Sequence, residues 1–109
     1  MADSTELLHG TLDTLILKTL SWGPRHGYGI ARWLRDATGD ALTVGEGSLY
    51  PALYRMEKKR WIVAEWGLSE DTGREVKCYA LTAAGRARLK AEVAQWEGFS
   101  RAVGKVLFA

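Results

Sequence analysis

Apolar residues in the first 60 positions recur every three or four residues, the spacing of one face of an α-helix. We predict three short helices in this part of the chain. The first begins between Glu6 and Thr11 and ends near Trp22, and the second follows Gly27 and ends at Thr38. Their apolar stripes are Leu8, Leu12, Leu15, Ile16 and Leu20 in the first, and Ile30, Trp33, Leu34 and Ala37 in the second.

The third helix is predicted to begin near Thr43, because Thr43 and Glu46 have the three-residue separation of a capping box, and to end near Arg60. Its apolar stripe is Leu49, Leu53 and Met56. Pro51 falls inside this helix, where proline removes one backbone hydrogen bond. Either the helix begins later, around Gly47, or it tolerates the loss and leaves one carbonyl oxygen open.

From Trp61 onward the apolar pattern changes to alternation, which is typical of β-strands. Two such segments, 61–68 and 76–81, are separated by a turn over 69–73, so we predict one β-hairpin. Thr82 can then cap a last helix that runs from Ala83 to about Leu107 without an interrupting proline. The order indicates an α+β fold, mainly α: a winged helix-turn-helix over 1–81 and a C-terminal dimerisation helix over 82–109, in one continuous domain.

The last helix is too long for the domain that precedes it. About 25 residues make a rod of roughly 37 Å, whereas a compact domain of 100 residues has a radius of gyration of about 13 Å. We expect its far half to pair with a second copy, because soluble monomers avoid such apolar stripes; the alternative is a bend at Gly98 or Gly104 that folds it back. The predicted homodimer interface is Leu8, Leu12, Leu89, Val93, Trp96, Phe99, Val103 and Val106.

Composition narrows the class of protein. A hydrophobic content of 47% with two prolines is typical of a folded chain. One cysteine and two histidines offer no disulfide and no metal-ligand spacing, so we expect neither metal nor cofactor. No Ser/His/Asp set or glycine-rich phosphate loop is evident, which argues against an enzyme. The sequence shows no membrane span or signal peptide, so we expect a cytoplasmic protein without a membrane partner.

The net charge of +2 says little about nucleic acids, but basic residues concentrate at the end of the third helix. If its apolar stripe faces inward, helical spacing turns the opposite face outward. Small and hydroxyl-bearing residues at the start of the helix favour a phosphate, and the Arg55 guanidinium can donate two hydrogen bonds to guanine. Double-stranded DNA is therefore the expected partner. The alternative is a solvated basic face. The outward residues are Gly47, Pro51, Tyr54, Arg55 and Lys58, with Ser48 and Tyr50 beside them.

Several strings of the sequence occur in the order and spacing of a known family. They are LHGTLDTLIL, HGYGI, GSLYPALYRME, the pair Gly73 and Arg74, and YALTAAG. From about Leu7 to Leu89 the chain resembles the PadR family of winged-helix repressors, and its single C-terminal helix resembles the short subgroup. The resemblance implies DNA contacts by Ser48, Tyr50 and Arg55, a phosphate contact by Tyr28, and backbone contacts from the wing by Arg74 and Lys77.

The chain departs from the family pattern at two places. Arg60 and Trp61 stand where members usually carry a glycine, so we expect the third helix to end without a left-handed glycine cap. Glu70 and Asp71 at the wing tip would repel phosphate if they faced DNA. These departures favour the helix contacts over the wing contacts.

The remaining aromatic and sulfur side chains are interpreted as structural. We expect Trp33, Trp61 and Trp66 in the core, His26 in a loop, and Cys78 as a small buried apolar residue.

Trp96 lies midway along the dimer face of the last helix. We interpret it first as an interface residue, and second as a platform for a small aromatic effector, since some PadR-like proteins form a cleft there for flat aromatic ligands. The competing function for the whole chain is a winged-helix dimer that binds another protein or carries a ligand without specific DNA binding.

Overall fold

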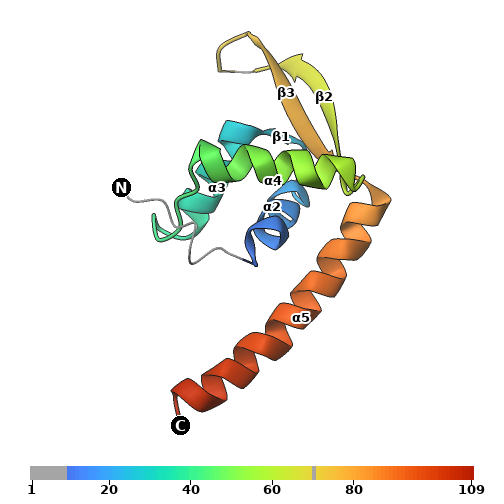
Figure 1. The fold of residues 1–109 in the computed structure, drawn as a ribbon. Helices are drawn as coiled ribbons and strands as arrows, with labels where there is room; N and C mark the ends of the chain where they lie inside the picture. Colours follow the sequence, from blue (N-terminus) through green and yellow to red (C-terminus); the bar gives the residue numbers. More distant parts are fainter. Residues whose placement is uncertain (1–9, 70) are drawn as a thin grey trace.

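The computed structural model describes residues 10–69 and 71–109 of the chain. Three helices precede a β-hairpin, and one long helix follows it, in the predicted order (Figure 1). The mainly helical α+β fold is therefore confirmed. The elements are α2 (Leu12–Leu20), β1 (Arg25–His26), α3 (Gly27–Ala37), α4 (Glu46–Lys58), β2 (Ile62–Leu68), β3 (Glu75–Leu81) and α5 (Ala83–Leu107).

The core forms where α2, α3 and α4 pack against the part of the sheet that contains Ile62 and Tyr79. Each helix contributes residues of its predicted stripe, and the two long strands add one buried residue each. Because α4 buries only one face, its opposite face is left toward solvent. The buried hydrophobic residues are Ile16, Leu17, Leu20, Ile30, Leu34, Leu49, Ala52, Leu53, Met56, Ile62 and Tyr79.

The start of α4 differs from the capping-box prediction. Gly45, in an extended conformation, is the N-cap residue, and no side chain caps the helix. The prediction at Thr43 was wrong because the helix begins later, at Glu46. Pro51 lies inside α4 and has no N–H to give to the carbonyl oxygen of Gly47, so the helix tolerates the loss of one bond.

The end of α4 has no glycine cap, as expected. Arg60 itself takes the left-handed conformation, with φ of 61°. Its N–H donates to the carbonyl oxygen of Glu57 at 3.0 Å, and the N–H of Trp61 donates to that of Met56 at 3.1 Å. These two bonds form a Schellman motif. The helix therefore ends through a left-handed residue, which is an arginine and not a glycine.

The sheet has three antiparallel strands in the order β1-β3-β2. The predicted hairpin pairs Ile62 with Leu81, and the unpredicted strand β1 pairs His26 with Cys78. His26 is therefore not a loop residue, and its Nδ1 accepts a hydrogen bond from the N–H of Gly29 at 3.0 Å, which caps α3. Cys78 is only half-buried, contrary to the prediction.

Trp66 was predicted in the core and is 68% exposed. It shares one face of β2 with Ile62, which is buried, and the hairpin projects beyond the helices (Figure 1). The inward face of the strand has nothing to pack against there. Trp33 and Trp61 do pack against the core, as predicted.

Helix α5 begins at a tight joint with the end of α4. The Thr82 side chain caps the helix by accepting the N–H of Gly85 at 3.0 Å, as its position predicted. Thr82 also donates its N–H to the carbonyl oxygen of Trp61 at 3.1 Å and its hydroxyl to that of Arg60 at 2.6 Å. Gly85 is buried against Trp61, so the first turn of α5 is fixed to the domain.

Beyond this joint, α5 runs unbroken to Leu107; its first half contacts α2, and its far half leaves the rest of the domain (Figure 1). The molecule is 53 Å long on its longest axis and has a radius of gyration of 14.8 Å. The alternative of a bend at Gly98 or Gly104 is therefore wrong. In the described part of the chain, no helix is long and apolar enough to cross a membrane.

Candidate nucleic-acid interface

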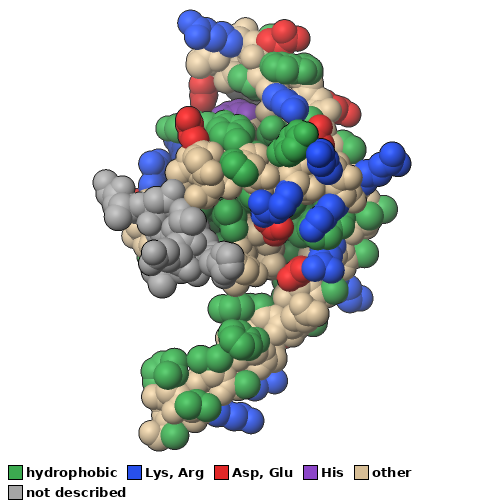
Figure 2. All heavy atoms as spheres, in the orientation of Figure 1, with side chains coloured by type: hydrophobic (Ala, Val, Ile, Leu, Met, Phe, Trp, Pro, Cys, Tyr) green, Lys and Arg blue, Asp and Glu red, His purple; other side chains and the backbone are tan. Residues whose placement is uncertain are grey.

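The structure leaves the expected DNA-contacting residues of α4 on its outer face. Gly47, Tyr54, Arg55 and Lys58 are exposed, Ser48 is half-buried, and Tyr50 is 43% exposed. Figure 2 shows Lys and Arg side chains gathered over the C-terminal half of α4. The helix thus presents small and hydroxyl-bearing residues at its start and cations at its end.

Two of these cations lie over aromatic rings. The ammonium of Lys58 lies 4.8 Å from the ring centre of Tyr54, and that of Lys59 lies 4.6 Å from the ring centre of Trp61. The exposed ring of Tyr54 and the Lys58 ammonium beside it therefore form one unit on the helix surface. Both groups are available to a nucleic acid that approaches this face.

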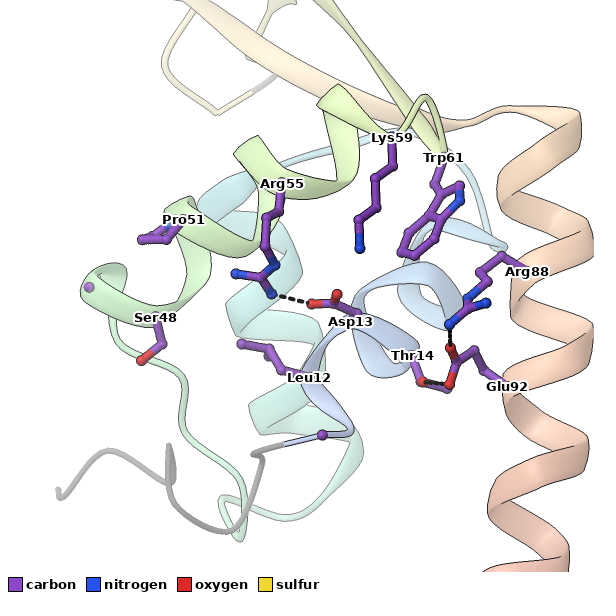
Figure 3. A pocket seen from close by; sticks show the side chains of 12 residues that line it. Leu12, Asp13, Thr14, Ser48, Pro51, Arg55, Lys59, Trp61, Arg88 and Glu92 are labelled. Atoms are coloured by element: carbon purple, nitrogen blue, oxygen red, sulfur yellow. Dashed lines mark hydrogen bonds and ion pairs between the residues drawn. The ribbon is translucent and has the colours of Figure 1, made fainter.

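Arg55 forms an ion pair with Asp13, a residue that the sequence analysis did not single out. Its Nη2 donates to Oδ1 of Asp13 in α2 at 2.8 Å (Figure 3). The two residues are 42 positions apart, and no sequence pattern predicts their contact. They line a hollow of about 590 Å³ between α2, α4 and α5, together with Lys59, Trp61, Arg88 and Glu92.

The two wing residues expected to contact the DNA backbone, Arg74 and Lys77, lie in different surroundings. Arg74 is exposed beside the turn, where Gly73 takes a φ of 69°. Lys77 instead faces α4, with its ammonium 3.5 Å from Oε1 of Glu57 and 5.5 Å from the ring centre of Tyr79. Asp71 is exposed, and Glu70 lies outside the described residues.

Tyr28 stands at the start of α3 and is 63% exposed, stacked on His26 with 6.2 Å between ring centres. The ring of Tyr50 lies directly against Gly27, where an added Cβ would come within 2.7 Å of the tyrosine Oη. Tyr28 and Tyr50 share a second hollow with Arg32, a cation absent from the sequence-based site. The glycine thus lets the starts of α3 and α4 approach closely.

The apolar stripe of α5 follows one side of the helix, with Lys and Arg on the other (Figure 2). Trp96 is 51% exposed and its ring lies 6.3 Å from that of Phe99. Leu12 and Leu89 pack against the chain's own core but, like Val103, are only half-buried. Leu8 lies outside the described residues. Exposed members of the stripe are Val93, Trp96, Phe99 and Val106, to which the structure adds Leu107 and Phe108.

Tyr79 is a titratable side chain that is buried in the core. Burial raises the pKa of Tyr79 above its ordinary value of 10.0, so the phenol stays neutral at physiological pH. Among residues 10–69 and 71–109, no three His, Cys, Asp or Glu side chains gather as metal ligands would.

Comparison with known proteins agrees with this arrangement. The sequence model of the transcriptional regulator PadR-like family matches residues 16–91. Protein X of Lysinibacillus sphaericus, which is uncharacterized, is 33% identical over 92 residues, or 84% of each chain.

Two solved structures share the fold over nearly the whole chain. A transcriptional regulator from Clostridium thermocellum has a TM-score of 0.82 at 29% identity, with 92% of this chain and 96% of that one covered. A PadR-like transcriptional regulator from Bacillus cereus has a TM-score of 0.82 at 30% identity, with coverage of 95% and 98%. The chain is therefore a winged-helix transcriptional regulator that belongs to the PadR-like family.

Proposed function

We propose that the protein binds specific DNA sequences as a homodimer and represses transcription by occupying a pseudo-palindromic operator. The observation that carries this proposal is the outer face of α4, where Tyr54, Arg55 and Lys58 are exposed together. A helix with small residues at its start and cations at its end fits the major groove of double-stranded DNA.

Each group on α4 has a role that its chemistry suits. Gly47 and Ser48 lie in the first turn of α4, where the positive end of the helix dipole favours a phosphate. Arg55 is the base-reading residue, because a guanidinium can donate two bonds to guanine. Tyr50, Tyr54 and Lys58 contact the backbone on either side of it.

The flanking contacts come from α3 and the wing. Tyr28 reaches a phosphate beside the start of α4, and Arg74 reaches the backbone from the wing. Lys77 contacts DNA only if it leaves Glu57, so Arg74 is the stronger wing contact. Asp71 opposes the wing contact through its charge.

The surface of α5 supports the proposed homodimer. Residues 1–81 form the DNA-binding region and 82–109 the dimerisation helix. Trp96 and Phe99 give α5 an exposed apolar side, which a second copy would cover in coiled-coil fashion. The proposed interface is Leu8, Leu12, Leu89, Val93, Trp96, Phe99, Val103 and Val106.

Such a dimer places two α4 helices about 34 Å apart, which matches successive major grooves. A signal that changes the angle between the two α5 helices would change this spacing and release the DNA. The half-exposed ring of Trp96 beside Phe99 supports a small aromatic effector as that signal.

Fluorescence anisotropy with labelled DNA from upstream of the chain's own reading frame tests the proposal. We expect tighter binding to this DNA than to a scrambled fragment, with an affinity that falls steeply as salt rises. Arg55→Ala should lose about 1–3 kcal/mol of discrimination at one base position. Arg101→Ala is the matched control, because Arg101 is an exposed arginine on α5.

Two results would move the proposal. Equal loss on all DNA sequences would make Arg55 a phosphate contact. Absence of any preference at low and physiological salt would favour the alternative dimer that binds a protein or carries a ligand.

The dimer has its own test. A chain truncated after Trp96 should lose both self-association in sedimentation experiments and affinity for the upstream DNA. If both survive truncation, the far half of α5 is not the dimer interface.

A further inference from the structure

We propose that Asp13 is a specificity-determining residue, which holds Arg55 for base reading and keeps it from binding phosphates indiscriminately. The inference rests on the proposed function, because it assumes that the outer face of α4 meets DNA. Asp13 itself lies on a different helix, in the first turn of α2.

The contact between the two side chains is close and partly covered. The 2.8 Å distance from Nη2 of Arg55 to Oδ1 of Asp13 is that of a charge-assisted hydrogen bond. The Asp13 side chain is 29% exposed and that of Arg55 is 53% exposed, so solvent reaches the arginine more freely than the carboxylate. Asp13 acts on Arg55 from the side of the protein, while the exposed part of Arg55 stays available.

This arrangement favours bases over phosphates. A guanidinium has five N–H donors, so one bond to Asp13 leaves enough for a two-bond contact with guanine. A base contact needs a fixed donor geometry, whereas a phosphate accepts from many directions. The carboxylate also offsets the charge of Arg55, which weakens attraction to any phosphate. Asp13 therefore lowers affinity for random DNA more than affinity for the operator.

Asp13 is itself held in place by its neighbours. The next residue, Thr14, donates its hydroxyl to Oε2 of Glu92 in α5 at 3.3 Å, and Glu92 pairs with Arg88 at 2.5 Å (Figure 3). The first turn of α2 is thus tied to α5 on one side and to Arg55 of α4 on the other. A carboxylate in the first turn of a helix is also favoured by the helix dipole.

The test compares operator and scrambled DNA over a range of salt for the wild-type chain, Asp13→Ala, Asp13→Asn, Arg55→Ala and the Asp13→Ala/Arg55→Ala double variant. We expect Asp13→Ala to bind scrambled DNA roughly fivefold more tightly, because one screened negative charge is gone and Arg55 is free. The slope of log affinity against log salt should steepen by about 0.9, the value for one more phosphate contact. The operator preference should fall by about the same factor as scrambled binding rises.

Asp13→Asn separates charge from orientation, since its amide oxygen still accepts a hydrogen bond from Arg55. It should tighten binding to both DNAs and keep the operator preference of the wild-type chain. Asp36→Ala is the control for loss of an exposed carboxylate, because Asp36 pairs with Arg35 of its own helix; it should leave preference and slope unchanged.

The outcomes distinguish the inference from the proposed function. If the wild-type chain prefers the operator and Asp13→Ala keeps both preference and slope, the inference is overturned alone. It is also overturned if the Asp13→Ala effects persist in the Arg55→Ala background. If the wild-type chain shows no operator preference, the proposed function fails and the inference with it.

Discussion

Gly85→Ala is expected to destabilise the protein by about 2–3 kcal/mol, although alanine is the better helix former. In a helix interior, the exchange of glycine for alanine would by itself stabilise by about 1 kcal/mol. At Gly85, however, the new Cβ would lie 2.0 Å from the carbonyl oxygen of Trp61. The two effects have opposite signs, so the stability of this variant tests the joint between α4 and α5.

The magnitude follows from what must move. A carbon and a carbonyl oxygen approach to about 3.3 Å at closest, so the start of α5 must shift by about 1.3 Å. That shift would break or strain the bonds of Thr82 to the carbonyl oxygens of Trp61 and Arg60, which are 3.1 and 2.6 Å long. Bonds of this kind contribute about 1 kcal/mol each, and overpacking costs about 1–3 kcal/mol, which exceeds the helix-propensity gain.

Urea denaturation at fixed protein concentration, followed by tryptophan fluorescence, measures the free energy of unfolding. Gly98→Ala is the matched control, because nothing lies within 4 Å of its added Cβ. It lies about 200° around α5 from Trp96 and should stabilise by about 0.5–1 kcal/mol. A Gly85→Ala protein as stable as Gly98→Ala would refute the close approach of α5 to Trp61.

Three further changes test other parts of the fold by the same measurement. Arg60→Gly should stabilise by about 0.5–1 kcal/mol, because the left-handed φ of 61° costs a side-chain-bearing residue more than glycine loses in chain entropy; unchanged or lower stability would contradict this. Trp66→Ser should change stability by less than about 0.5 kcal/mol, because the ring is 68% exposed, and a larger loss would mean that the ring is buried. Burial raises the pKa of Tyr79 in the folded chain above 10.0. Its contribution to the free energy of unfolding is therefore complete below pH 10.0, where the phenol is protonated in the unfolded chain as well. This contribution is lost as the pH rises toward the folded pKa. Tyr79→Phe should therefore flatten the alkaline fall in unfolding free energy, and an equally steep fall would assign it to other groups.

Local patterns predicted the long elements well. Leu49, Leu53 and Met56 share one face of α4 because helical spacing is a property of the backbone alone. The cap at Thr82 could be predicted because a helix start needs one hydroxyl at one position. The same spacing also indicated which side chains of α4 face outward.

Elements created by distant parts of the chain could not be predicted. Strand β1 is only two residues long and exists because Arg25 and His26 pair with β3, more than 50 residues later. Trp66 alternates correctly along β2, but alternation says nothing about where the core ends. Arg60 adopts a conformation that its residue type disfavours, since docking of Trp61 against the core requires the turn.

The candidate DNA-binding site also has one part that helical spacing predicts and another that it does not. Exposure of Tyr54 and Lys58 follows from the helix period, whereas two ion pairs join α4 to elements distant in the sequence. Asp13 reaches Arg55 from α2, and Lys77 reaches Glu57 from the wing. Neither pair leaves a trace in local spacing, because each depends on how the helices and the hairpin pack.

The hydrogen bonds between Trp61 and Thr82 allow the tip of the wing to vary without a change in the rest of the fold. They join the chain just before β2 to the chain just after β3, so the hairpin forms a loop closed at its base. The entropy of closing a loop grows only slowly with its length, so residues inserted between Ser69 and Arg74 would burden the domain little. Members of a family with such a joint can change the length and charge of the wing tip during evolution without moving α5 relative to α4. In the proposed dimer, new operator preferences would therefore arise in the wing while the position of α5 relative to α4 is inherited unchanged.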